Sequence, residues 1–246
     1  ALMMFAYSFL AMTAYNIIKP ITRSKYIDQL GADNIPWVLL AAAVLIGFIL
    51  QGYSRLAGLL PGRLVIPVTQ GGLAGLLVLF WFLFGGSSEG WIPVAFYFLG
   101  LVMGILLISQ FWTLANDIFD ARQAKRLFGF IGAGSVLGGM MGSGLTTQAK
   151  RLGTQNLLLL SAAVLALCVA IVWTVLRQTK GTQLAGIAAA GKEEESVSGA
   201  EAFRLLKESR HLQVIALVIA FAGLGSSILE QQLNMAAAEF LGTDDP

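Results

Sequence analysis

Residues 90–116 read GWIPVAFYFLGLVMGILLISQFWTLAN, a stretch of 27 residues with no charged side chain. About 20 apolar residues are enough to cross the hydrocarbon of a bilayer, and a charge at its centre costs a few kcal/mol. A stretch of this length and composition therefore predicts a transmembrane helix.

The same pattern occurs six more times along the chain. The other uncharged windows are 1–18, 34–54, 64–88, 127–149, 152–176 and 211–229. With 57% hydrophobic and 12% charged residues, the chain has more apolar surface than a soluble domain of this size buries in its core. We therefore predict an all-α fold, a polytopic transmembrane helix bundle of seven helices.

The charged gaps between the windows predict an orientation. Cytoplasmic loops of membrane proteins carry an excess of Lys and Arg. With a cytoplasmic N-terminus, the loops on that side hold eleven basic residues and the opposite loops hold only Lys25, Lys150 and Arg151. The eleven are Arg55, Arg63, Arg122, Lys125, Arg126, Arg177, Lys180, Lys192, Arg204, Lys207 and Arg210. The N-terminus is therefore predicted to be cytoplasmic.

The spacing of the windows predicts three domains. Residues 1–178 form a six-helix bundle, residues 179–209 a cytoplasmic linker with a short amphipathic helix from about residue 198 to 209, and residues 210–246 a seventh helix. Six helices, a long linker and a seventh helix is the layout of a transporter built from two six-helix halves. We expect a chain truncated at both ends, with most of the C-terminal half missing.

Small and amide residues predict how the helices pack. In GFIGAGSVLGGMMGSG (129–144), three glycines, at positions 134, 138 and 142, share one helix face, which allows close approach of another backbone. Glycines 71, 72 and 75 suggest the same for the third helix. Three amides, Gln51, Gln70 and Gln110, are predicted to be buried, where they either tie helices together or line a polar cavity.

The first candidate site lies on the first helix. Tyr15, Lys19 and Arg23 recur every four residues, so they share one face if the helix continues through Pro20. An aromatic and cationic stripe suits an anionic substrate, whose oxygens accept charge-assisted hydrogen bonds. The alternative is that Lys19 extends to the outer membrane interface.

Two further groups break the apolar pattern. Glu230 lies in a polar turn of the seventh helix, where it could pair with a cation of the first helix, bind a proton, contact substrate or mark the outer interface. Asn116 and Asp117 close the fourth window, and Arg122, Lys125 and Arg126 precede the fifth. These charges either form ion pairs that gate the cytoplasmic side or belong to a solvated loop. The list of gating candidates is Asp117, Arg122, Lys125 and Arg126.

Several function classes are excluded by composition. The chain has one His and one Cys, Cys168, and therefore neither a disulfide framework nor the paired ligand spacing of a metal site. No nucleophile has a nearby His and Asp, and no continuous cationic face suits nucleic acid. We expect no enzyme, no cofactor and no metal; the expected partners are the lipid bilayer and a small anionic substrate.

Five strings carry a resemblance to a known family. They are YNIIK (15–19), IP (35–36), IGFILQGYSRLAGLL (46–60), FWTLAN followed by AKRLF and GAG (111–134), and SSILEQQ (226–232). In this order and spacing, the chain resembles the ATP/ADP translocases of intracellular bacteria and plastids and their bacterial relatives, which belong to or border the major facilitator superfamily. The resemblance covers the first seven helices of a twelve-helix transporter.

The resemblance implies a function for several residues. It implies nucleotide exchange by alternating access, with the phosphates held by basic residues of a central cavity. Lys19 falls on one of these positions, and Arg23 falls on a second with a shift of one residue. We expect Tyr15 and Asn116 to bind substrate beside them, in a protein of the bacterial inner membrane. Glu230 falls on the family's acidic position of the seventh helix. Gly100 stands where the nucleotide exchangers carry a functional glutamate, and Asn234 stands where many relatives have a lysine. These two departures leave open another phosphorylated anion, a different solute or lipid moved with protons, or a membrane anchor or sensor fused to a regulatory domain.

Overall fold

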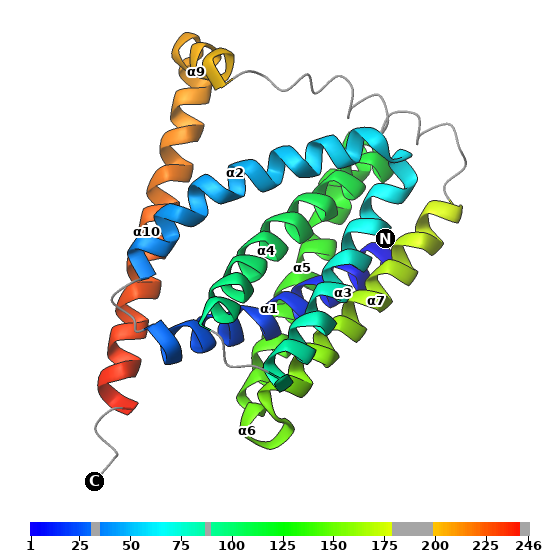
Figure 1. Ribbon diagram of the computed structural model, residues 1–246. Coiled ribbons are helices and arrows are strands. Elements are labelled where there is room, and N and C mark those ends of the chain that lie inside the picture. The colour runs from blue at the N-terminus through cyan, green and yellow to red at the C-terminus, as the bar shows by residue number, and fades with distance from the viewer. Residues whose placement is uncertain (31–34, 87–89, 179–198, 242–246) are drawn as a thin grey trace. The chain divides into compact units, whose positions relative to one another are not determined.

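The computed structural model of the chain describes residues 1–30, 35–86, 90–178 and 199–241, although some side chains within these ranges are not described. It divides into two compact units, Ala1–Glu193 and Glu194–Pro246. The described elements of the first unit are α1 (Leu2–Leu30), α2 (Ile35–Leu59), α3 (Gly62–Gly86), α4 (Trp91–Ile118), α5 (Ala121–Thr147), α6 (Ala149–Leu152) and α7 (Thr154–Gln178) (Figure 1). The second unit contains α9 (Gly199–Glu208) and α10 (Arg210–Leu241).

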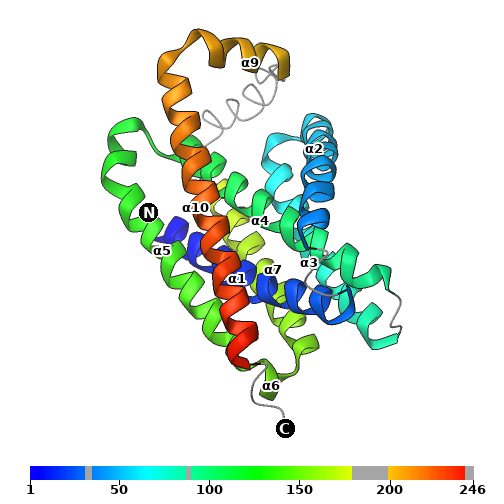
Figure 2. The same cartoon turned by 90° about the vertical axis from the view of Figure 1, so that its left-hand side faces the viewer.

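The described residues confirm the all-α membrane bundle. Five helices are long and apolar enough to cross a bilayer. Their spans are Leu2–Asp28, Gly62–Gly86, Trp91–Ile118, Arg122–Thr147 and Thr154–Arg177. The two other predicted windows also lie in helices, α2 and α10, and α9 coincides with the predicted amphipathic helix. Within the second unit, α9 meets the first residues of α10 at a sharp bend (Figure 2).

Helix α1 is the central helix of the first unit. It packs against α5, α7 and α4, and α3 packs in turn against α7. Its side chains Ile17 and Ile18 are fully buried in the larger apolar cluster, together with Leu77 of α3 and Phe96 of α4. Pro20 lies inside α1 without ending it, so the condition for a shared face of Tyr15, Lys19 and Arg23 is met.

The glycines of α5 form the closest helix contact in the first unit. A Cβ atom added at Gly138 would lie 2.1 Å from the carbonyl oxygen of Phe9 on α1. The corresponding distances are 2.7 Å from Gly134 to the Phe5 oxygen and 2.6 Å from Gly142 to the Thr13 oxygen. A hydrogen bond also connects the two helices at this contact: the Thr13 hydroxyl donates to the carbonyl oxygen of Gly138 at 3.1 Å. The predicted backbone-to-backbone approach is confirmed.

The glycines of α3 are not in close contact with another helix. A Cβ atom at Gly71, Gly72 or Gly75 would meet no other atom within 4 Å. The spacing shows only that α3 can be approached closely, and no atom of another described helix lies within contact distance of these three glycines. The prediction of a second glycine seam is therefore wrong.

Candidate functional site

The candidate site is the polar face of α1, which consists of Tyr15, Lys19 and Arg23. Lys19 is exposed and the other two side chains are half-buried, whereas Ile17 on the opposite side of the helix is fully buried. Because α1 is one continuous helix, successive members of the face lie one turn apart. The structure thus brings together the three candidates that the sequence placed on α1.

Contacts with α4 fix the depth of Lys19. The ring of Tyr15 lies against Gly104, and the side chain of Thr22 lies against Gly100. Lys19 therefore lies between the levels of Gly100 and Gly104, which are the tenth and fourteenth of the 28 residues of α4. At 1.5 Å per residue, this is within about 7 Å of the midpoint of α4.

This depth bears on the two alternatives for Lys19. A hydrocarbon layer of about 30 Å centred on α4 would place the Cα atom of Lys19 about 8 Å or more from its nearer edge. A purely interfacial lysine would have to extend its side chain along the helix through that distance. An ionisable residue inside the membrane needs water, a protein partner or an anion around its charge. The geometry therefore favours the membrane-interior alternative.

The two glycines of α4 serve the packing of α1. A Cβ atom at Gly104 would lie 2.6 Å from the Tyr15 ring, and one at Gly100 would lie 2.9 Å from the Thr22 side chain. A larger residue at either position requires the side chain on α1 to move. In this chain, Thr22 takes the space that a glutamate at position 100 would need.

Two other substrate candidates are not assembled with this face. Asn116 is exposed at the far end of α4, twelve residues and about 18 Å along the helix from Gly104. Glu230 lies in α10 of the second unit, and its side chain and that of Asn234 are outside the described residues.

The gating candidates lie at the junction of α4 and α5. Asp117 is half-buried, and its Oδ2 atom is buried without a hydrogen-bond partner among the described residues. Arg122, Lys125 and Arg126 are exposed on the first turns of α5. Between these described side chains there is no ion pair, so a gate built from them stays a prediction.

A buried polar cluster joins four helices of the first unit. It consists of Tyr7 (α1), Tyr53 (α2), Thr69 and Gln70 (α3) and Gln110 (α4). The Gln70 amide donates to the Tyr7 hydroxyl and to the Gln110 carbonyl oxygen, the latter at 3.3 Å. The Gln110 amide donates to the Thr69 hydroxyl at 2.6 Å and to the Tyr53 hydroxyl at 3.4 Å. The side-chain amides of Gln70 and Gln110 therefore connect the four helices. The Oε1 atom of Gln70 has no hydrogen-bond partner among the described residues.

The sequence identified only part of this cluster. Gln70 and Gln110 were predicted to be buried and are fully buried, but Gln51 is exposed on α2 and that part of the prediction is wrong. Tyr7, Tyr53 and Thr69 were missed. A tyrosine or threonine in an apolar helix carries little signal by itself, because its partner is known only once the helices are assembled.

A comparison with known families decides the identity of the chain. A sequence model described as TLC ATP/ADP transporter matches residues 78–239, which is 162 of the 246 residues. The chain belongs to the TLC ATP/ADP transporter family. No curated protein matches the chain, and neither does any solved structure.

Membership of the TLC family gives the chain its class. It is an integral, multi-pass membrane protein of a nucleotide transporter family, and not an enzyme. Within the described residues, no group of three His, Cys, Asp or Glu side chains could hold a metal ion. The matched segment begins in α3, so the polar face of α1 precedes it and is argued from geometry alone.

Proposed function

We propose that this TLC family member exchanges nucleotides across a membrane by alternating access, with the polar face of α1 binding the phosphates. The observation that supports this is the position of Lys19 near the midpoint of α4, with Arg23 one turn further along the same face. A lysine at the centre of a membrane helix costs about 2.5–3.5 kcal/mol on insertion scales. A water-filled site for an anion offsets that cost.

The chemistry of the face matches a nucleotide. The Arg23 guanidinium can donate two parallel hydrogen bonds to one phosphate, and the Lys19 ammonium acts as a compact charge on another. Their Cα atoms are separated by about 6 Å along the helix, so both can contact one polyphosphate chain. Tyr15, one turn away on the other side of Lys19, is half-buried against Gly104, and the part of its ring and hydroxyl that is not covered by α4 would contact the nucleoside.

The same proposal assigns a role to each of the three segments of the chain. Residues 1–178 would form the first six-helix half of a major facilitator-like transporter, residues 179–209 a cytoplasmic linker, and residues 210–246 the start of the second half. Rocking of two halves about a central site is the general scheme of such transporters. The N-terminus would be cytoplasmic by the positive-inside rule, and the membrane would be a bacterial inner membrane.

Four groups of candidates take their roles in this scheme. Glu230 would couple or gate transport from the second half, and Asn116 would contact substrate from the far end of α4 in another state of the cycle. The charges at the α4–α5 junction would close the cytoplasmic side by forming ion pairs in one state and opening them in the other. They are Asp117, Arg122, Lys125 and Arg126.

Transport by the full-length protein tests the proposal. Proteoliposomes loaded with ADP are expected to take up labelled ATP, and Lys19→Ala is expected to lower that uptake at least tenfold because the phosphates lose a cation. Lys25→Ala is the matched control: Lys25 lies on the same helix, but its ammonium stacks over the Phe84 ring of α3 at 5.7 Å. It should retain most of the wild-type uptake.

Two results would contradict the proposal. One is wild-type protein that inserts correctly and moves no nucleotide in either direction. The other is equal uptake by the Lys19 and Lys25 variants.

A second candidate is transport of a smaller phosphorylated anion by the same face. It is favoured by Gly100, whose space is taken by Thr22, because the nucleotide exchangers that the chain resembles carry a glutamate there. Uptake of labelled inorganic phosphate in the same proteoliposomes separates the two candidates. Phosphate uptake without ATP uptake would select the second.

A further inference from the structure

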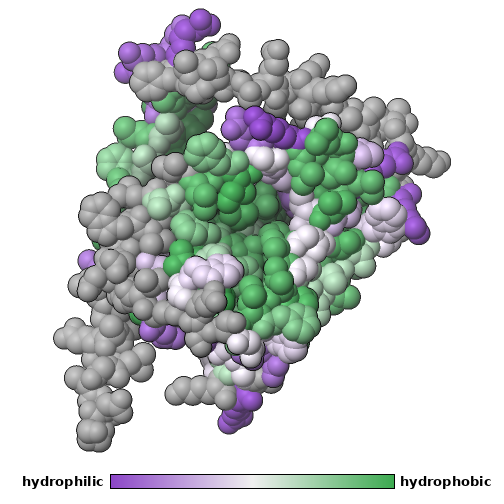
Figure 3. All heavy atoms as spheres, viewed as in Figure 1, coloured by the Kyte–Doolittle hydropathy of each residue, from purple (hydrophilic) through white to green (hydrophobic). Residues whose placement is uncertain are grey.

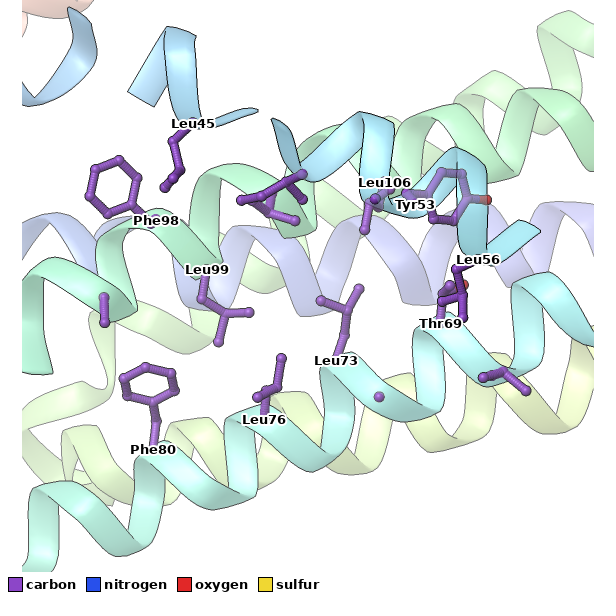
Figure 4. A pocket seen from close by; sticks show the side chains of 16 residues that line it. Leu45, Tyr53, Leu56, Thr69, Leu73, Leu76, Phe80, Phe98, Leu99 and Leu106 are labelled. Carbon is purple, nitrogen blue, oxygen red and sulfur yellow. The ribbon is translucent and has the colours of Figure 1, made fainter. Parts of the chain in front are cut away.

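A cavity of about 930 Å³ lies between α2, α3 and α4, away from the polar face of α1. Side chains of all three helices point into it, as Figure 4 shows. Most of its lining is aliphatic or aromatic, including Leu73, Leu76 and Phe80 of α3 and Phe98 and Leu99 of α4.

The two polar side chains of the lining, Tyr53 and Thr69, already form hydrogen bonds within the protein. The Tyr53 hydroxyl accepts a hydrogen bond from Gln110 at 3.4 Å. The Thr69 hydroxyl donates to the carbonyl oxygens of Val65 and Ile66 and accepts from Gln110. A ligand in this cavity would therefore find apolar walls and almost no hydrogen-bonding partners. Phosphate or ribose would lose its hydration there without compensation, so the cavity excludes nucleotides.

The cavity opens towards the surface of the membrane-spanning part. Four of its large lining side chains are exposed: Leu45 by 39%, Leu56 by 40%, Leu76 by 41% and Val68 by 44%. Figure 3 shows that the surface over α3 and α4 is broadly apolar on this side. The cavity is therefore continuous with an apolar outer surface of the first unit, of the kind that membrane hydrocarbon can cover.

Its length matches one leaflet of a bilayer. Along α3 the lining extends from Val68 to Phe80, which is about 18 Å at 1.5 Å per residue. Half of a hydrocarbon layer of about 30 Å is about 15 Å. An empty space of this size would also forfeit dispersion contacts along three helices, and α2 makes few other contacts with α3 and α4.

We propose that this cavity binds an acyl chain of a bilayer phospholipid, which lies along α3 and fills the space between α2 and α4. The site is separate from the nucleotide face, so its failure would leave the proposed transport function untouched. The chain enters from the lipid side, and the buried side chains Leu73 and Leu99 contact it.

Photo-crosslinking of the full-length protein tests this directly. The probe is phosphatidylethanolamine with a diazirine in one acyl chain, incorporated into liposomes with the protein. Mass spectrometry is expected to find label on Leu73 and Leu99, which are only 5% and 8% exposed and are reached by a lipid only from inside the cavity. Label confined to the exposed side chains of α3, such as Phe82, would overturn the proposal.

Glycine variants supply the matched comparison. Gly72 lines the cavity and Gly75 does not, and a Cβ atom at either position meets no atom within 4 Å. Gly72→Trp is expected to fill the cavity and reduce the label on Leu73 at least threefold, whereas Gly75→Trp leaves it unchanged. Equal labelling of the two variants would overturn the proposal. If Gly72→Trp does not fold, the position of the label in the wild-type protein decides alone.

Discussion

Two surfaces of α1 differ in how closely they are packed. One face is pressed against α5, where carbonyl oxygens of α1 lie so close to three glycines that a Cβ atom would not fit. The other carries Tyr15, Lys19 and Arg23 and leaves Lys19 exposed near the middle of the membrane-spanning length. The difference teaches that one helix can combine a rigid support with a binding surface, because the closest contacts with α5 come from Phe5, Phe9 and Thr13 and precede the turns that carry Lys19 and Arg23.

The packed face is expected to give the largest effect on folding. Gly138→Leu places side-chain atoms where the Phe9 carbonyl oxygen lies, so α1 and α5 must separate along the whole seam. Overpacking typically costs about 1–3 kcal/mol, and an overlap with backbone atoms belongs at the upper end of that range. We expect little folded full-length protein in detergent, measured by the monodisperse fraction in size-exclusion chromatography and by the melting temperature.

Gly71→Leu is the control for this variant. Gly71 is also a glycine in the middle of a membrane-spanning helix, but its Cβ atom would meet nothing within 4 Å. Its melting temperature should stay close to that of the wild type. Equal losses in the two variants would mean that the α1–α5 seam is no more constrained than an open helix face.

A smaller effect is expected at the buried polar cluster. Tyr7→Phe removes the hydroxyl that accepts a hydrogen bond from Gln70, leaving a fully buried amide with one partner fewer. Interhelical hydrogen bonds in membranes contribute about 0.6–2 kcal/mol. We expect a loss of about 1 kcal/mol of stability, measured by thermal unfolding in detergent.

Tyr15→Phe makes the comparison between the faces sharper. Tyr15 belongs to the polar face, and no hydrogen bond of its hydroxyl is found among the described side chains. Stability should remain unchanged, while the apparent affinity for nucleotide falls if the hydroxyl contacts the nucleoside. A larger stability loss for Tyr15→Phe than for Tyr7→Phe would mean that the Tyr15 hydroxyl supports the fold and is not available to substrate.

Sequence reasoning was most reliable where a pattern depends on one helix alone. The uncharged windows predicted the membrane helices, and the four-residue spacing predicted that Tyr15, Lys19 and Arg23 share a face. It failed where a partner helix decides the outcome. Glycines 134, 138 and 142 and glycines 71, 72 and 75 look alike in sequence, yet only the first set is approached by another helix.

The same limit applies to the polar residues. Gln51 and Gln70 are both amides within apolar helices, but only Gln70 faces inwards, and its partners Tyr7 and Gln110 come from helices distant in sequence. The depth of Lys19 was also beyond the sequence, because it follows from the contacts of Tyr15 and Thr22 with two glycines of α4.

The central claim is that Lys19 faces a water-filled, nucleotide-binding site inside the membrane. Its most direct test is Lys19→Cys in a full-length protein whose other reactive cysteines are removed, treated with a membrane-impermeant thiol reagent in proteoliposomes. Cys168 is fully buried and should not react. We predict that the new thiol is labelled and that ATP or ADP, at a concentration raised enough to saturate the site weakened by the loss of the Lys19 ammonium, slows its labelling at least fivefold. Labelling at the same rate with and without nucleotide, or no labelling at all, would contradict the account.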